Sequence, residues 1–116
     1  MFFKSIHFSH TKDETVQNKI ITAAEATRKW AEENYVRHNA SENLCGLCAI
    51  ASSRLWQNLQ MRGIKSRLMM SNLERHSFYH VFVEHDGLLI DVTATQFGEE
   101  EIVIKPIETS SECPWY

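Results

Sequence analysis

A few side chains in this sequence are of types that together carry out nucleophilic chemistry. They are Cys45, Cys48, His76, His80 and Asp91. A thiol becomes an effective nucleophile when a neighbouring imidazole takes its proton and a carboxylate orients that imidazole. We therefore expect Cys48 to be a nucleophile, His80 its general base and Asp91 the group that orients the base. Cys45 and His76 are the alternative nucleophile and base.

The segment that contains His80 and Asp91 predicts a β-hairpin. Asp86-Gly87 is typical of a two-residue turn between antiparallel strands. With these residues in the turn, Phe82 lies opposite Asp91, and His80 becomes its diagonal neighbour. Diagonal neighbours have Cβ atoms about 7 Å apart, which allows a hydrogen bond between an imidazole and a carboxylate. The register alone thus predicts that the base and its orienting acid meet.

Alternation along the two strands divides the hairpin side chains between two faces. One face is almost wholly aliphatic and is expected to join the core; it carries Tyr79, Val81, Val83, Leu88, Ile90 and Val92. The other face carries His80, Phe82, Glu84, Leu89, Asp91 and Thr93. An alternative interpretation of this second face is an ordinary solvated surface on which one histidine and one aspartate meet by chance.

Cys48 is expected in the first turn of a helix, with Gly46 or Asn43 as its N-cap. Unpaired N–H groups and the positive end of the helix dipole lie there, and both stabilise a thiolate. The backbone N–H of Cys48 can also donate to the oxyanion formed when sulfur attacks a carbonyl. A second donor must come from elsewhere. Asn43, Ser41 and Gln96 are the candidates, although Asn43 can equally be a cap and Gln96 part of a strand exit.

The wider pattern places these side chains on two helices and four strands. Apolar residues at three- and four-residue steps predict helices over 13–36 and 47–62. Alternating or β-branched segments predict strands over 65–71, 77–84, 88–93 and 101–105. This order predicts an α+β fold, with two N-terminal helices packed on an antiparallel sheet, in a single domain over 1–116.

Composition restricts the partners and the compartment. The chain has 15 acidic residues against 12 Lys and Arg, a formal net charge of -3 and no basic run, so neither nucleic acid nor a membrane is an expected partner. No secretory leader and no apolar stretch of bilayer length is readable, so we expect a cytoplasmic protein. Three cysteines form an odd set, which indicates reduced thiols rather than a disulfide framework.

Two stretches of the sequence resemble known cysteine enzymes. Cys45-Gly46-Leu47-Cys48-Ala49 resembles the Cys-Gly-x-Cys-aromatic signature at the nucleophile of papain-like peptidases, with Cys48 at the nucleophile position. The segments 80–84 and 89–93, His-Val-Phe-Val-Glu and Leu-Ile-Asp-Val-Thr, resemble the His-aromatic-Val-Glu and Leu-x-Asp strands of transglutaminase-like proteins. The order Cys, His, Asp agrees as well, and the resemblance covers roughly residues 41–98.

The departures from papain favour the transglutaminase-like branch. Ala49 replaces the usual aromatic residue, Glu42 stands where papain-like peptidases have a glutamine, and Asp91 stands where they have an asparagine. The resemblance implies a papain-like/transglutaminase-like core with a Cys-His-Asp triad. It implies thiol-dependent acyl transfer or hydrolysis of an amide bond, as in a cysteine peptidase, amidase or deamidase. The expected substrate is a peptide or protein with an amide or glutamine acyl donor, and no metal or organic cofactor is required.

A zinc site is the main alternative. Cys45, Cys48, His76 and His80 are four side chains of the types that bind structural zinc, and under that hypothesis the chain is a binding or scaffold module. The two pairs are much farther apart along the chain than in a compact zinc finger. A redox Cys-x-x-Cys is not expected, because that motif follows a strand in a βαβ unit and the residues before Cys45 indicate helix and loop.

Overall fold

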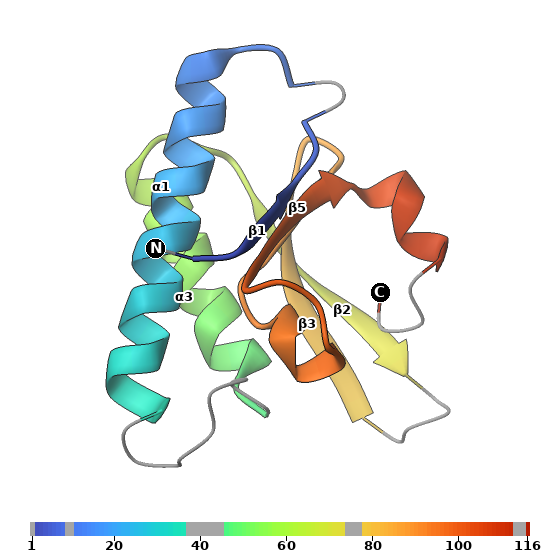
Figure 1. Ribbon diagram of the computed structural model, residues 1–116. Coiled ribbons are helices and arrows are strands. Elements are labelled where there is room, and N and C mark those ends of the chain that lie inside the picture. The colour runs from blue at the N-terminus through green and yellow to red at the C-terminus, as the bar shows by residue number, and fades with distance from the viewer. Residues whose placement is uncertain (1, 9–10, 37–45, 74–77, 113–115) are drawn as a thin grey trace.

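The computed structural model describes residues 2–8, 11–36, 46–73, 78–112 and 116. In this part of the chain, two α-helices pack on a five-stranded sheet (Figure 1), so the predicted α+β class is confirmed. The elements in chain order are β1 (Lys4–Ile6), α1 (Glu14–Ala31), the π-helical turn η1 (Glu32–Val36), α3 (Cys48–Met61), β2 (Arg67–Leu73), β3 (Phe78–His85), β4 (Leu88–Asp91), the 3₁₀ helix η3 (Ala94–Phe97), β5 (Ile102–Pro106) and the 3₁₀ helix η4 (Ile107–Glu112).

The helix predicted over 13–36 is present as α1 followed by η1. Asp13 is the N-cap, and its side chain accepts a hydrogen bond from the Thr15 backbone N–H at 2.8 Å. Residues at three- and four-residue steps are buried on one side: Ile20, Ala23, Ala24, Thr27, Arg28 and Ala31. The small side chains among them allow α1 to lie close to its neighbours.

The helix predicted over 47–62 is α3. Its N-cap is Leu47, which corrects the expectation of Gly46; Asn43, the other expected cap, lies outside the described residues. Gly46 instead has a φ of 82°, in the left-handed region, and turns the chain just before the helix. The helix buries Ala51, Ser52, Leu55 and Leu59.

The four predicted strands are present as β2 to β5, and each end lies within two residues of the predicted one. The order of strands in the sheet is β1-β5-β4-β3-β2. The expectation of an antiparallel sheet is wrong at one edge, because β1 pairs in parallel with β5. The Ile102 N–H donates to the Phe3 carbonyl at 3.2 Å, and the His7 N–H donates to the Ile104 carbonyl at 2.7 Å. A three-residue strand has too short a pattern to be recognised, so the mixed sheet depends on this long-range pairing.

The hairpin has the predicted turn and register. Glu84 pairs with Leu89, as the sequence indicates. Asp86 and Gly87 have φ angles of 48° and 82°, as a type I′ turn requires. The strand β4 ends at Asp91, two residues earlier than predicted, and the chain then enters η3.

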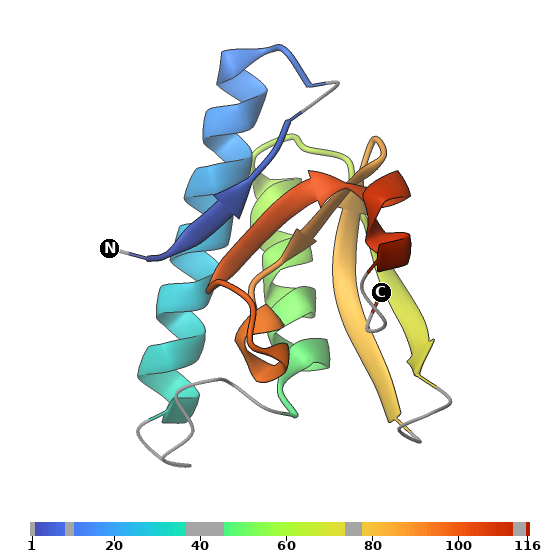
Figure 2. The same cartoon turned by 45° about the vertical axis from the view of Figure 1, so that its right-hand side comes forward.

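The sheet is covered on both faces. The helices α1 and α3 lie on one face, and η4 and the end marked C lie on the other (Figure 2). On the helix side, Val83, Leu88, Ile90 and Val92 join the main core, as predicted. Tyr79 and Val81 do not: 59% of the Tyr79 surface is exposed near the start of β3, and Val81 is only partly buried.

The opposite face carries a second buried cluster. It consists of Phe82, Leu89, Ala94 and Val103, with Met69, Ile107 and Tyr116 packed against it. The alternative of a solvated face is therefore wrong. His80, Asp91 and Thr93 are each 0% exposed.

Candidate active site

His80 and Asp91 form a buried hydrogen-bonded pair. His80 Nε2 lies 2.7 Å from Asp91 Oδ2. A carboxylate only accepts, so Nε2 carries the proton that it donates to Asp91. This leaves Nδ1 of the neutral ring as the nitrogen that can take a proton from a nucleophile. The structure brings together the two residues that the hairpin register places side by side.

The Asp91 carboxylate is held by further donors at the end of β4. Its Oδ1 accepts hydrogen bonds from the Thr93 backbone N–H at 2.8 Å and the Thr93 hydroxyl at 3.3 Å. Its Oδ2, which accepts from His80, also accepts from the Tyr116 hydroxyl at 2.7 Å. Both oxygens are therefore engaged, and the carboxylate cannot rotate away from His80 without breaking several of these bonds.

Aromatic rings surround the His80 imidazole. Phe97 meets it edge to face with ring centroids 4.8 Å apart, Phe82 is stacked at 6.1 Å, and the Tyr116 ring lies at 5.6 Å. These contacts restrict rotation of the imidazole about its side-chain bonds. They also exclude water, which strengthens the hydrogen bond to Asp91.

Cys48 is the first residue of α3 and so lies in the first turn of the helix, as predicted; its thiol is free and half-buried. Its Sγ lies 4.0 Å from the Tyr79 carbonyl oxygen. One helical turn later, the Ser52 hydroxyl donates to the Val81 carbonyl at 2.9 Å. These contacts place the start of α3 directly beside the part of β3 that carries His80.

Cys48 and His80 influence each other's protonation. Burial alone would raise the pKa of the Cys48 thiol, but hydrogen bonds to His80 and the Val81 backbone, together with the charge of His80, lower that pKa below its ordinary value of 9.0. Burial alone would lower the pKa of His80, but hydrogen bonds to Asp91 and Cys48 raise it from 6.5 to about 9. Both shifts favour a thiolate paired with an imidazolium.

Gln96 lies beside the imidazole. Its Nε2 is 3.4 Å from His80 Nδ1 and 3.4 Å from the Thr93 hydroxyl oxygen. It is carried by η3, the short helix that follows β4. Of the three candidate second donors, Gln96 is placed next to His80, whereas Asn43 and Ser41 lie outside the described residues.

The sequence interpretation missed two residues that support this region. Arg28 is 1% exposed, and its Nη1 donates to the Val92 carbonyl at 2.9 Å and to the Thr95 hydroxyl at 3.0 Å. It therefore ties α1 to the chain on either side of Thr93. Its position on the buried side of α1 was a usable signal. Tyr116 had no such signal, because it follows no periodic segment.

The zinc site stays a hypothesis. Cys45 and His76, two of its four ligands, lie outside the described residues, as do the alternative donor Ser41 and the residue Glu42. Among the described residues, no group of three or more His, Cys, Asp and Glu side chains is placed to hold a metal ion.

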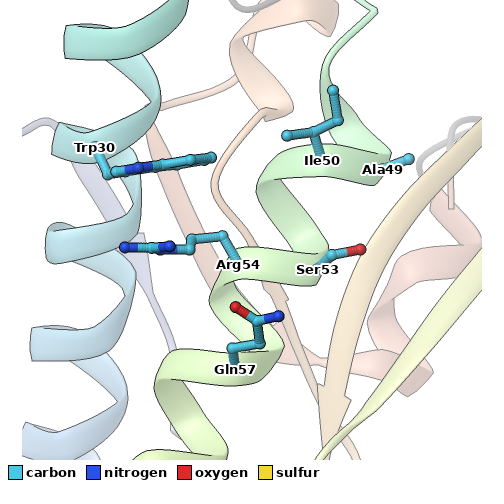
Figure 3. A pocket seen from close by; sticks show the side chains of 6 residues that line it. All are labelled: Trp30, Ala49, Ile50, Ser53, Arg54 and Gln57. Atoms are coloured by element: carbon cyan, nitrogen blue, oxygen red, sulfur yellow. The ribbon is translucent and has the colours of Figure 1, made fainter.

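A hollow of about 390 Å³ lies between α1 and α3 (Figure 3). It is lined by Trp30, Ala49, Ile50, Ser53, Arg54 and Gln57. The Arg54 guanidinium is stacked 4.8 Å from the centre of the Trp30 ring. An α-helix turns about 100° per residue, so Ile50 and Gln57 point away from the side of α3 that carries Cys48 and Ser52. The hollow therefore lies on the outer surface of α3 and is separate from the thiol.

Comparison with known proteins gives no relative for this chain. No protein-family model matches the sequence, and neither curated proteins nor solved structures match it significantly. In the described ranges, none of the helices combines the length and the apolar character needed to cross a membrane.

Proposed function

We propose that this protein is a cysteine-nucleophile enzyme that hydrolyses an amide bond or transfers its acyl group, on a papain-like/transglutaminase-like core. The observation that carries the proposal is the buried His80–Asp91 pair, with Nε2 and Oδ2 2.7 Å apart, directly beside the free thiol of Cys48. The catalytic residues are Cys48 as nucleophile, His80 as general base and acid, and Asp91 as the group that orients His80.

In the first step, Cys48 attacks the carbonyl carbon of the amide. The hydrogen bond from Nε2 to Asp91 holds the neutral imidazole in the tautomer with a free Nδ1, which accepts the thiol proton. A new C–S bond forms, and the carbonyl oxygen takes up negative charge. The pKa of Cys48 is lowered and that of His80 is raised, so the resting state already favours the required ion pair.

The start of α3 supplies a donor for the oxyanion. The first intrahelical bond there runs from the Ala51 N–H to the Leu47 carbonyl at 2.9 Å, so the Cys48 N–H precedes the helical ladder and can face the substrate oxygen. The Gln96 amide is the second donor in this proposal, because it lies beside the same imidazole. Together these two donors stabilise the negative charge that forms on the carbonyl oxygen only after Cys48 has attacked.

The second half of the reaction returns the proton. His80 donates it to the leaving amine, the C–N bond breaks, and an acyl thioester remains on Cys48. Water, deprotonated by His80, then cleaves the thioester and regenerates the thiol. An amine in place of water would give transfer instead of hydrolysis. The proposed substrate is a peptide or protein with an amide or glutamine acyl donor.

Alkylation of Cys48 by iodoacetamide tests the proposal without a known substrate. At neutral pH, Cys48 is expected to react at least about tenfold faster than an ordinary exposed thiol, because its pKa is lowered. His80→Ala and Asp91→Asn should each remove most of this difference in alkylation rate. The labelled residue is identified by mass spectrometry after digestion.

His85→Ala is the matched control, because His85 lies at the turn end of β3 and should leave the labelling rate unchanged. The proposal is wrong if Cys48 in the native protein reacts no faster than an ordinary thiol, or if His80→Ala leaves its rate unchanged. About one tightly bound zinc per chain in the purified protein would instead support the metal-site hypothesis.

A further inference from the structure

Tyr116 is held against the second face of the sheet by contacts with four strands. Its hydroxyl donates to Asp91 at the end of β4, and its carbonyl oxygen accepts a hydrogen bond from the Ser71 hydroxyl of β2 at 2.9 Å. Its ring meets Phe82 of β3 at 5.2 Å, and Lys105 Nζ of β5 lies 5.2 Å above it. In Figure 2 the label C marks its place on the face of the sheet opposite α3.

The hydroxyl of Tyr116 and the imidazole of His80 share one carboxylate oxygen. Both donate to Asp91 Oδ2, each across 2.7 Å. The shared oxygen lies in a buried environment, where His80 and Asp91 are both 0% exposed. In such surroundings, a second donor withdraws negative charge from the oxygen and weakens it as an acceptor for the first.

We propose that Tyr116 is a positioning residue of the active site, whose hydroxyl fixes the Asp91 carboxylate and moderates its hold on the His80 imidazole. This inference rests on the proposed function and adds to it a group that controls the strength of the base. The hydroxyl holds Asp91 Oδ2, the oxygen that also accepts from Nε2, and the ring packs beside the imidazole with centroids 5.6 Å apart. Through the shared carboxylate oxygen, Tyr116 thereby tunes the proton exchange between His80 and Cys48.

Charged groups approach this pair from several elements, and one is Arg28 of α1, which bonds Val92 and Thr95 on either side of Thr93. Cys48 of α3 acts on His80 from the nucleophile side, and Asp91 acts on it from β4. Lys105 of β5 faces the Tyr116 ring. The helix η3 presents the neutral amide of Gln96. A substitution that removes only the Tyr116 hydroxyl therefore changes the hydrogen bonding of one carboxylate oxygen and leaves these charges in place.

The test is a titration of His80 in Tyr116→Phe from pH 5 to 11. NMR signals of the His80 ring protons report its protonation at each pH. The variant keeps the aromatic ring and removes the shared hydrogen bond. Asp91 should then hold the imidazolium more strongly, so the His80 midpoint should rise by about half a pH unit. Tyr35→Phe is the matched control, because Tyr35 packs on Trp30, far from the sheet face that carries Tyr116, and its variant should leave the midpoint unchanged.

An unchanged His80 midpoint in a folded Tyr116→Phe protein would show that Tyr116 is only a packing residue and would overturn the inference. The proposed function would survive that result if Cys48 remained unusually reactive. If the variant does not fold, the native protein provides a second measurement. The hydroxyl proton of Tyr116 should be visible by NMR as a slowly exchanging, downfield resonance close to the His80 ring, and its absence would equally overturn the inference.

Discussion

The two ring nitrogens of His80 have different neighbours, and this difference decides which nitrogen donates a hydrogen bond and which can accept a proton. Nε2 is bonded to Asp91, whereas Nδ1 faces Gln96 at 3.4 Å. A histidine placed by chance on a solvated surface would have no such constraint on its tautomer. The buried Asp91 carboxylate and the aromatic rings around His80 together select one orientation and one tautomer of the imidazole.

The raised pKa of His80 has a consequence for stability that can be measured in Cys48→Ser, where the thiol no longer titrates. Asp91 should still hold the His80 pKa above 6.5, although below the value of about 9 reached with Cys48 present. A group whose pKa is raised on folding stabilises the protein below its unfolded pKa and loses that effect as the pH rises through its folded pKa. The free energy of unfolding of Cys48→Ser should therefore fall between about pH 6.5 and the folded midpoint.

Urea unfolding across this pH range measures the effect, with Cys48→Ser/Asp91→Asn as the control. The double variant lacks the charged partner, so its unfolding free energy should show little of this decline. A decline of equal size in both proteins would contradict the assignment of the raised pKa to Asp91.

Two side chains that lie one helical turn apart on α3 join this helix to the strand β3. Cys48 and Ser52 lie on the same side of α3, and both point to backbone atoms of β3. Ser52 is 0% exposed, so its hydroxyl is a structural link in the core and not a surface group. The position of Cys48, the proposed nucleophile, therefore depends on the packing of a whole helix against a whole strand.

Replacing Ser52 by Ala should destabilise the protein by about 1–2 kcal/mol, because the buried Val81 carbonyl loses its donor. It should also slow the alkylation of Cys48, since the start of α3 is held less closely to His80. Urea unfolding and the iodoacetamide assay measure the two effects. Ser53→Ala is the matched control, because Ser53 is exposed on the outer side of α3 and should change neither quantity. Equal effects of both variants would argue against the Ser52 link.

Each face of the sheet carries a buried cluster, so this small molecule has two separate buried layers. The main core lies between the helices and the sheet, and the second cluster lies beneath η4 and Tyr116. The His80–Asp91 pair belongs to the second layer, on the same face as Phe82 and Leu89. The site is consequently built into a packed layer rather than attached to an exposed surface.

Leu89→Ala should reveal this second layer through its stability cost. Leu89 is 0% exposed, so truncation should lower the free energy of unfolding by about 2–5 kcal/mol. Leu68→Ala is the control, since Leu68 is 45% exposed and its truncation should cost no more than about 1 kcal/mol. Equal losses in the two variants would mean that this face is solvated after all.

Local patterns in the sequence are sufficient for much of this architecture. The two helices follow from three- and four-residue spacing, and the hairpin and its register follow from Asp86-Gly87. That register brings His80 beside Asp91, and the predicted helix start places Cys48 in the first turn of α3. These features depend on interactions between residues close along the chain, or on a turn whose geometry is nearly invariant. They are therefore readable without knowledge of the tertiary structure.

The features decided only by tertiary structure all join residues that are distant along the chain. The parallel pairing of β1 with β5, the Arg28 contacts with Val92 and Thr95, and the Tyr116 hydroxyl on Asp91 have no periodic signature. Burial of the second hairpin face likewise depends on segments that fold back over it. Hydrogen bonds and burial of this kind are set by how the layers pack together, and a pattern that repeats every two or four residues does not contain that information.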